Sequence, residues 1–403
     1  MSVLYAFGFN SCRQINPGLN ADHISQPTIL RYVECSRLSD SSFRRVYFMD
    51  EDLYFNTGET IIDVKISWNC IAALNTWNEL LVWCDTRNGV PFNVPFRFTS
   101  ICFGTTNILY NSHEQLLWMS TDNMRDCRQI KLMERRCNSE DGERLVEEVV
   151  ECEEEFIDVQ CCGDGSLFFL SKSNVLYQSE RPAGLCEKSG KVTVVRAEYA
   201  DRMFNLWTPK IIQVTCGKNH TLCLSDVCVV FSFGNGNQGQ LGIGKWDFVM
   251  RPRMIDKLVG TKITKICAGG WHNLAISEDG DIYSWGWNRF GQVGLPFKDE
   301  NEFDSWVDDG DNNNDDDKNI ITDIACGARH SLCQSANGRV YSWGWNVFGQ
   351  LGYDSEEESR WQPTEITFFR SFKSKRIYAG AWNSVVLVEG DYSSHLIERN
   401  SSL

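Results

Sequence analysis

The chain has 403 residues, of which 54 are acidic and 39 are basic, and its formal net charge is −15. No stretch approaches the roughly 18 consecutive apolar residues of a membrane-spanning helix, and residues 1–7 lack the pattern of a secretion signal. The 17 cysteines show no paired spacing, which favours a reducing compartment, the nucleus or the cytoplasm. We therefore expect no membrane contact and, because the charge is negative, no direct nucleic acid contact.

The first predicted element is half of a repeated unit. Residues 3–15 align without a gap on residues 339–351, and Phe7-Gly8 falls on the Trp343-Gly344 pair. We expect a strand that ends in a structured loop at both places, because glycine adopts the positive φ that such a loop requires. The chain therefore begins halfway through a repeat.

Three degenerate copies of the unit follow, each with short apolar runs of the kind that form paired strands. They span residues 64–84, 101–118 and 159–177. A polar stretch between the last two contains a first acidic insertion at residues 139–155, for which we predict a short helix over residues 143–152.

Three clear copies occupy residues 216–242, 267–294 and 326–352. Each predicts two strands joined by a tight turn, followed by a loop that is rich in glycine. The copies align one histidine and one aromatic–glycine pair, and the histidines are 52 and then 58 residues apart. The aligned residues that we interpret as structural are His220, His272, His330, Trp285, Gly286, Trp343 and Gly344.

The last predicted elements are a second acidic insertion at residues 297–319, half a repeat at residues 377–388 and a tail at residues 391–403. The second insertion has few apolar residues and predicts a disordered loop. Together the two insertions hold 19 acidic and 3 basic residues, which leaves 35 acidic and 36 basic residues elsewhere. The acidity of the chain is therefore confined to the insertions.

A unit of about fifty residues built from short strands cannot bury its apolar face alone, so neighbouring units must pack against it. The half unit at residues 377–388 completes the one at residues 3–15, which would close a ring without an exposed sheet edge. With three degenerate and three clear copies, the count is seven. We predict an all-β fold, a single seven-bladed β-propeller over residues 1–390, whose N- and C-terminal strands share the last blade.

The sequence gives little support for a catalytic or ligand-binding site. Residues 234–239 match the G-x-G-x-x-G pattern of nucleotide-binding loops, but the other copies identify a repeat loop, and no helix follows. Cys216, His220 and Cys223 have a spacing typical of metal ligands, yet residues 220 and 223 of a strand point to opposite faces. We predict no enzyme, no cofactor, no metal, and repeat histidines that are buried and hydrogen-bonded.

Aromatic and arginine side chains lie beside the repeat glycines and histidines, at the ends of predicted strands. Such side chains are favoured anchors of protein interfaces. Packing between blades is the open alternative for Trp271, Arg289 and Arg329. The acidic insertion would add attraction for a basic partner such as a histone. The candidate partner-binding residues are Trp271, Trp287, Arg289, Arg329, Trp345, Asp308, Asp309 and Asp311.

The string G-G-W-H-N-L, followed by D-G-D-I-Y-S-W-G-W-N-R-F-G-Q-V-G, lies within residues 269–294 and resembles the regulator of chromosome condensation repeat. The resemblance is specific over residues 211–352 and implies a seven-bladed propeller. The sequence is most similar to a group of stand-alone propellers that is associated with a Jumonji-C oxygenase. This similarity implies a non-enzymatic partner of a histone demethylase or hydroxylase, located on nuclear chromosomes, with roles in histone methylation, the mitotic spindle and chromosome segregation.

The family also offers an alternative function, guanine-nucleotide exchange or another form of regulation of a small nuclear GTPase. Members that act in this way use acidic and histidine side chains in the loops just before the repeat histidine. Here those loops carry Lys218, Trp271 and Arg329, and none of the clear copies has a carboxylate there. The loops therefore favour the oxygenase partner over the exchange factor.

Overall fold

The structure is a computed structural model. The residues that it describes are 2–9, 23–29, 44–45, 61–66, 70–75, 80–84, 93–94, 100–103, 107–111, 116–120, 128–140, 144–180, 190–200, 209–244, 246–294, 304–306, 320–353 and 357–389.

Each clear repeat forms the second and third strands of a four-stranded antiparallel sheet, as predicted, and consecutive strands are neighbours. The first strand of each sheet lies largely before the repeat. The first sheet contains β17 (Ile211–Cys216), β18 (His220–Ser225), β19 (Val230–Gly234) and β20 (Val249–Met254). The second contains β21 (Ile263–Ala268), β22 (His272–Ser277), β23 (Ile282–Gly286) and β24 (Asp304–Trp306). The third contains β25 (Ile321–Cys326), β26 (His330–Ser335), β27 (Val340–Trp345) and β28 (Ser359–Glu365).

The two ends of the chain share one sheet, as predicted. Its strand order is β2 (His23–Ile29), β1 (Ser2–Phe9), β30 (Asn383–Glu389) and β29 (Lys373–Ala379). Gly8 has φ +119° and Gly344 has φ +102°, so the backbone adopts the same positive φ at the equivalent positions of β1 and β27. The half repeats therefore complete one another in space as well as in sequence.

The degenerate repeats also form antiparallel strands. A three-stranded sheet holds β4 (Ile61–Ile66), β5 (Cys70–Asn75) and β6 (Leu80–Cys84), and β3 (Arg44–Arg45) pairs with β7 (Asn93–Val94). A nine-stranded sheet contains two further units. The first consists of β8 (Ser100–Phe103), β9 (Asn107–Asn111), β10 (Leu116–Ser120), β11 (Arg128–Glu140) and β12 (Arg144–Glu151). The second consists of β13 (Phe156–Cys161), β14 (Leu167–Ser171), β15 (Leu176–Ser179) and β16 (Lys191–Arg196).

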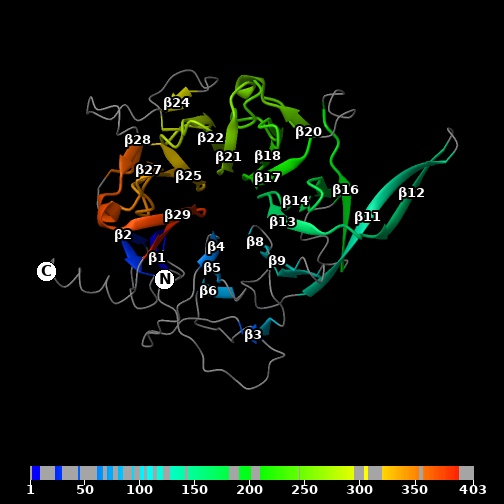
Figure 1. Cartoon of the computed structure of the whole chain (residues 1–403), viewed down its shortest axis with the longest axis horizontal. Coiled ribbons are helices and arrows are strands. Elements are labelled where there is room, and N and C mark those ends of the chain that lie inside the picture. The colour runs from blue at the N-terminus through cyan, green and yellow to red at the C-terminus, as the bar shows by residue number, and fades with distance from the viewer. Residues whose placement is uncertain are drawn as a thin grey trace.

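The predicted helix over residues 143–152 is wrong. Residues 144–151 form β12, which pairs with β11 in a hairpin that extends away from the ring (Figure 1). The valines of this segment favour a strand, and β11 supplies the hydrogen bonds that a helix would otherwise have to make internally. The acidic insertion is therefore half of a hairpin.

The second acidic insertion is not loop throughout, contrary to the expectation for residues 297–319. Residues 304–306 form β24 and pair with β23, because the outer edge of that sheet offers unpaired backbone groups. Asp308, Asp309 and Asp311 lie outside the described residues.

The sheets surround a central axis like the blades of a propeller (Figure 1). Contacts between first strands run from β29 to β4, β8, β13, β17, β21 and β25, and then return to β29. The count of seven blades remains a prediction, because parallel pairing of β11 with β16 joins two units in one sheet. The extent of the propeller, residues 1–390, and the tail at residues 391–403 also remain predictions.

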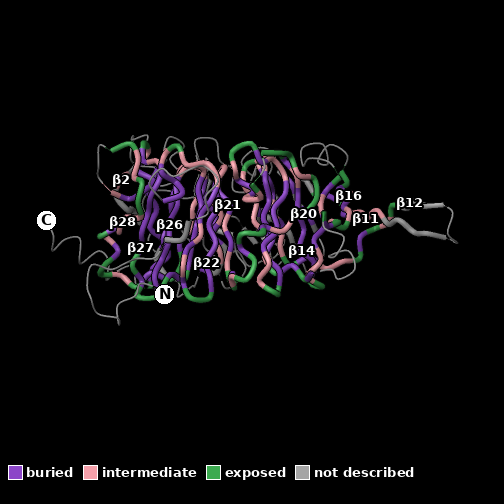
Figure 2. Tube along the Cα trace, turned by 90° about the horizontal axis from the view of Figure 1, so that it is seen from above, coloured by how far each residue is buried: buried purple, intermediate pink, exposed green. Residues whose placement is uncertain are grey.

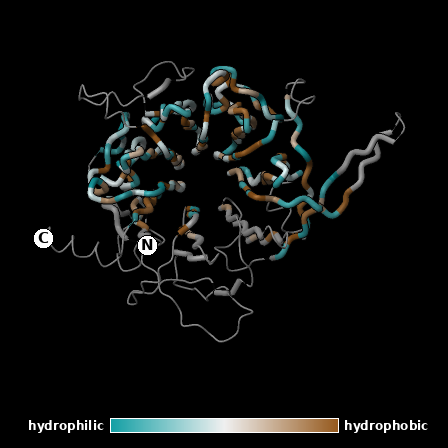
Figure 3. The backbone as a smooth tube through the Cα atoms, in the orientation of Figure 1, coloured by the Kyte–Doolittle hydropathy of each residue, from teal (hydrophilic) through white to brown (hydrophobic). Residues whose placement is uncertain are grey.

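Apolar side chains pack between neighbouring sheets. Leu222 and Leu224 of β18 pack against Ile266, Ala275 and Trp285 of the next sheet. Buried residues run along the strands and exposed ones gather at their two ends (Figure 2), and hydrophobic segments lie in the sheets around the ring (Figure 3). Two 3-10 helices, η1 (Asp256–Leu258) and η3 (Thr367–Ser371), add Leu258 and Phe369 to this packing.

No helix in the described part of the chain is long and apolar enough to cross a membrane.

Candidate functional site

The repeat histidines connect neighbouring sheets. His220 Nε2 lies 2.7 Å from Asn273 Oδ1, His272 Nε2 lies 2.9 Å from Ser331 Oγ, and His330 Nε2 lies 3.0 Å from Ser384 Oγ. In every case the partner belongs to the next sheet. The imidazoles are buried, with at most 1% of the residue exposed, which confirms the prediction of buried, hydrogen-bonded histidines.

The partner of each histidine fixes the tautomer of its ring. Ser331 Oγ donates to the carbonyl of Gln292 at 2.7 Å, so it must accept from His272 Nε2–H. Asn273 Nδ2 likewise donates to the carbonyl of Gln240 at 2.7 Å and leaves its Oδ1 to accept from His220. Gln240 and Gln292 lie in loops of the sheets that contain His220 and His272, respectively. Each chain of hydrogen bonds therefore runs from one sheet to the next and back, and joins the two.

Burial keeps these imidazoles neutral. It lowers the pKa of His220 to about 4 and the pKa values of His272 and His330 to about 3. The Nδ1 atoms are buried without a hydrogen-bond partner among the described residues, so a proton there would be an unsatisfied donor. We use the word frame for the buried residues that join neighbouring sheets by hydrogen bonds, and these three histidines belong to it.

The repeat tryptophans belong to the same frame. The indole N–H groups of Trp285 and Trp343 donate to the carbonyls of Gln240 and Gln292, at 3.1 and 2.9 Å. The two residues are 3% and 1% exposed. Gly344 must stay small, because a Cβ there would lie 2.6 Å from the carbonyl oxygen of Arg329.

Two loops of each sheet meet at the end where the second strand begins and the third strand ends. His272 lies opposite Gly286, so residues 271 and 287 are neighbours. The Trp287 N–H donates to the carbonyl of Trp271 at 2.8 Å, and the Trp345 N–H donates to that of Arg329 at 2.9 Å. In these two sheets, the residue before the repeat histidine therefore lies beside the residue that follows the aromatic–glycine pair.

Backbone hydrogen bonds also join these loops from one sheet to the next. The N–H of Lys218 donates to Gly270, that of Gly270 to Gly327, and that of Ala328 to Ala381, each at 3.1 Å. These bonds fix the loops of four consecutive sheets relative to one another. Side chains on the loops are therefore presented on a rigid base.

The side chain of Arg329 lies at the centre of this loop surface. Its guanidinium carbon is 4.9 Å from the ring centroid of Phe290, 5.0 Å from that of Trp345, 5.5 Å from that of Trp382 and 5.8 Å from that of Trp287. These distances are within the range of cation–π attraction. One arginine therefore contacts four rings from three sheets.

The rings form a continuous chain around Arg329. Trp271 packs edge-on against Trp287 at 5.4 Å, Trp287 against Phe290 at 5.5 Å, and Phe290 is 5.7 Å from Trp345. Lys218 lies over Trp271 at 4.9 Å. We call this surface the aromatic face and define it by Lys218, Trp271, Trp287, Arg289, Phe290, Arg329, Trp345, Phe348 and Trp382.

Positive charge on the aromatic face is not neutralised by the described residues. Within the part of the chain that the structure describes, Lys218, Arg289 and Arg329 form no ion pair. Arg329 Nε is buried without a hydrogen-bond partner among those residues. Burial, and secondly the charge of Arg289, lower the pKa of Arg329.

The structure brings five sequence-predicted residues together on the aromatic face. They are Trp271, Trp287, Arg289, Arg329 and Trp345. Phe290 and Phe348 also follow the repeat glycines, among the aromatic positions predicted as interface anchors, whereas sequence reasoning did not assign Lys218 or Trp382 to the site. The alignment held a signal for Trp382, which stands before Asn383 as Trp271 stands before His272.

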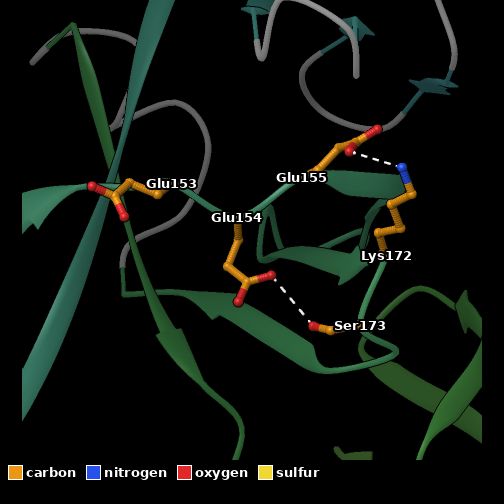
Figure 4. A pocket seen from close by; sticks show the side chains of 5 residues that line it. All are labelled: Glu153, Glu154, Glu155, Lys172 and Ser173. Atoms are coloured by element: carbon orange, nitrogen blue, oxygen red, sulfur yellow. Dashed lines mark hydrogen bonds and ion pairs between the residues drawn. The ribbon is translucent and has the colours of Figure 1, made fainter.

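A cavity of about 490 Å³ lies elsewhere, beside β13 and β14, and is lined by Glu153, Glu154, Glu155, Lys172 and Ser173 (Figure 4). Lys172 pairs with Glu155 at 3.1 Å, and Ser173 donates to Glu154 at 3.3 Å. Much of the polarity of this cavity is therefore satisfied internally.

Potential metal ligands are dispersed. The described ranges contain no cluster of three or more His, Cys, Asp or Glu side chains that could hold a metal ion. Cys223, one of the residues with metal-like spacing, is buried among apolar side chains, and burial raises the pKa of its thiol. It is therefore a protonated core residue.

Comparison with known sequences identifies the repeats. A family model described as "Regulator of chromosome condensation (RCC1) repeat" matches residues 229–276, 279–334 and 337–387. The mouse (Mus musculus) protein "RCC1 domain-containing protein 1" is 31% identical over 209 residues, which cover 44% of this chain and 55% of that protein. The Arabidopsis thaliana "Ultraviolet-B receptor UVR8" is 32% identical over 182 residues, 45% of this chain and 40% of that protein. The chain spans about half the length of the first curated relatives that it matches.

Solved structures share the fold at low sequence identity. Human WBSCR16 superposes with a TM-score of 0.68 at 14% identity, over 97% of this chain and 99% of that chain. Prp20p of Saccharomyces cerevisiae gives 0.65 at 16% identity, over 100% and 94% of the two chains. The chain is thus a β-propeller, and its residues 229–276, 279–334 and 337–387 match the regulator of chromosome condensation repeat.

Proposed function

We propose that this protein is a non-enzymatic interaction propeller that binds a chromatin protein through the aromatic face. The observation that carries the proposal is Arg329, held among four aromatic rings on loops whose backbones are hydrogen-bonded between sheets. Tryptophan and arginine are enriched among residues that dominate binding energy. Rigid loops also reduce the entropy lost when a partner binds.

The frame below the aromatic face supports a binding role more than a catalytic one. His220, His272 and His330 are buried, neutral and engaged between sheets, so they are poor candidates for proton transfer to a ligand. The aromatic face itself offers cations and rings, without a nucleophile and base in contact. This chemistry suits a protein surface.

For the partner, we propose a Jumonji-C oxygenase that acts on histones, with this chain as its non-catalytic subunit on nuclear chromosomes. The support is the similarity to stand-alone propellers of this family. Prp20p, which shares the fold, is described as binding Gsp1p and histones, and this is consistent with chromatin partners in the family. Roles in histone methylation and chromosome segregation would follow.

The acidic insertion at residues 297–319 supports a second, electrostatic contact. We propose that it attracts a basic part of the same assembly, such as a histone. Deletion of residues 298–318 should then weaken histone binding more at low salt than at moderate salt. A salt-independent affinity that survives the deletion would remove this part of the proposal.

The experiment that tests the function is affinity capture of the tagged full chain from nuclear extract, at low and moderate salt. A Jumonji-C oxygenase should co-purify with the wild type and be lost with Trp345→Ala. Val227→Ala is the control, because Val227 is an exposed apolar residue at the opposite end of its sheet. Recovery of a nucleotide-free small GTPase in its place would favour the alternative, a GTPase regulator.

A further inference from the structure

The charge of the aromatic face indicates the chemistry of what it binds. Three cations, Lys218, Arg289 and Arg329, lie along the chain of rings, and no described carboxylate pairs with any of them. Some exposed cations elsewhere do have acidic partners; Lys262, for example, pairs with Glu278 at 2.7 Å. The aromatic face therefore gathers three cations beside aromatic rings without a described acidic partner.

Aromatic rings compensate Arg329 only in part. A ring attracts the flat face of a guanidinium, but the five N–H donors lie in the guanidinium plane and need acceptors at its edge. Arg329 Nε is buried and has no acceptor among the described residues. A carboxylate meets this need best, because it can accept two parallel hydrogen bonds from one guanidinium.

We propose that the aromatic face binds an acidic peptide segment of the partner protein, with an Asp or Glu carboxylate paired to Arg329. The inference rests on the proposed function and specifies which part of the partner is recognised. Lys218 and Arg289 attract further carboxylates at two other points of the aromatic face. Trp287, Trp345 and Trp382 contact the apolar side chains between them.

A peptide carboxylate fits better than a nucleic acid phosphate. The chain carries a net charge of −15, so it repels a long polyanion as a whole, whereas a short acidic segment on a neutral or basic protein is repelled much less. The rings of the aromatic face also offer apolar contact area to side chains. Single-stranded DNA is therefore the competing ligand that the experiment must include.

The test is fluorescence anisotropy of the full chain with three labelled probes. They are a ten-residue peptide of alternating Glu and Leu, the same peptide with Gln for Glu, and a ten-nucleotide thymidine strand. The Glu peptide should bind at least about tenfold more tightly than either other probe, because a charge-assisted pair replaces a weaker contact. Its affinity should fall with rising salt.

Arg329→Gln should weaken the Glu peptide about tenfold or more, and Arg329→Lys should recover only part of this loss, because Lys cannot form the two-bond pair. Arg339→Gln is the matched control, since Arg339 is exposed at the opposite end of the same sheet. Equal affinity for Glu and Gln peptides, or an unchanged affinity in Arg329→Gln, would overturn the proposal. Tighter binding of the thymidine strand would overturn it as well.

Two other occupants of the aromatic face are distinguishable. If deletion of residues 298–318 raises the affinity for the Glu peptide about tenfold, the occupant is the chain's own insertion. If the chain forms dimers that Arg329→Gln dissociates, the occupant is a second copy. Either result replaces the partner segment proposed here.

Partner capture with the same variants separates this inference from the proposed function. Loss of the partner in both Trp345→Ala and Arg329→Gln supports both. Loss in Trp345→Ala alone retains the function and refutes the acidic segment. Retention in both variants refutes both.

Discussion

The frame and the aromatic face are built from neighbouring residues of the same loops, yet they differ in burial, charge and hydrogen bonding. His272 is fully buried and neutral, whereas Trp271 directly before it is half-exposed and lies below a lysine. Arg329 and His330 show the same contrast: Arg329 is half-exposed among aromatic rings, whereas His330 is buried and bonded to the next sheet. The side chain that begins the second strand points between sheets, and the one before it remains at the end of the ring.

One repeat can therefore place a residue that stabilises the fold directly beside a residue that is available for binding. The frame positions use hydrogen bonds that are closed inside the fold, so their partners must be matched between sheets. The positions of the aromatic face have no such constraint and can vary between copies, as Lys218, Trp271, Arg329 and Trp382 do. Substitutions should therefore separate into two classes.

The largest expected effect concerns the frame and pH. Folding keeps three histidines neutral with lowered pKa values, whereas the unfolded chain takes up a proton on each below its ordinary pKa of 6.5. The stability is therefore fully present above pH 6.5 and is lost as pH falls, by about 4 kcal/mol per pH unit for the three together. Urea unfolding at pH 7.5, 6.0 and 5.0 measures this.

The variant His330→Asn provides the control, because Asn383 occupies the equivalent position in the sheet shared by the chain ends. It should reduce the pH dependence by about a third. If the unfolding midpoint is the same at pH 7.5 and 5.0, the histidines are not the source of the frame's stability.

The next largest effect compares two tryptophans that lie two residues apart. Trp343→Ala should lower the free energy of unfolding by about 3–5 kcal/mol, because it leaves a cavity between sheets. Trp345→Ala removes a half-exposed ring and should cost about 1 kcal/mol or less, while abolishing partner capture. Thermal and urea unfolding of both variants measure the difference. Equal losses would contradict the division between frame and aromatic face.

A smaller effect is expected from added volume in the frame. A Cβ at Gly269 would lie 2.5 Å from the carbonyl oxygen of Gly327 and would also overlap the His272 ring. Gly269→Ala should therefore cost about 1–3 kcal/mol. In a double-mutant cycle with His272→Ala, the double variant should lose less unfolding free energy than the sum of the two single losses. The reason is that alanine at position 272 removes one of the two overlaps. Full additivity would show that the ring does not limit this position.

The smallest effect on stability is expected at the centre of the aromatic face. Arg329→Gln removes a half-buried cation whose pKa burial already lowers, so the free energy of unfolding should change by about 0.5 kcal/mol or less. Urea unfolding at pH 7.5 measures this change. A loss comparable to that of Trp343→Ala would assign Arg329 to the frame and leave the face without its central binding residue.

Sequence reasoning succeeded where the signal is local and repeated. The aligned histidines, the aromatic–glycine pairs and residues 3–9 of the first half repeat all occupy the predicted positions, and residues 10–15 of that half repeat lie outside the described residues. It failed over residues 143–152, where short apolar runs allow a helix or a strand, and only the neighbouring β11 decides between them. The same holds for residues 304–306, which pair with a sheet edge that the sequence does not display.

By itself, the sequence determined the hairpins, their glycine turns and the sharing of one sheet by the two chain ends, because these depend on periodicity and on residue types that recur in register. Tertiary structure alone decided that Arg329 lies among Phe290, Trp345 and Trp382, which come from three different sheets. The curvature of the ring and the hydrogen bonds between its loops set these distances. Trp345 belongs to the same repeat as Arg329, but Phe290 and Trp382 belong to neighbouring sheets, so the spacing within one repeat does not encode their positions.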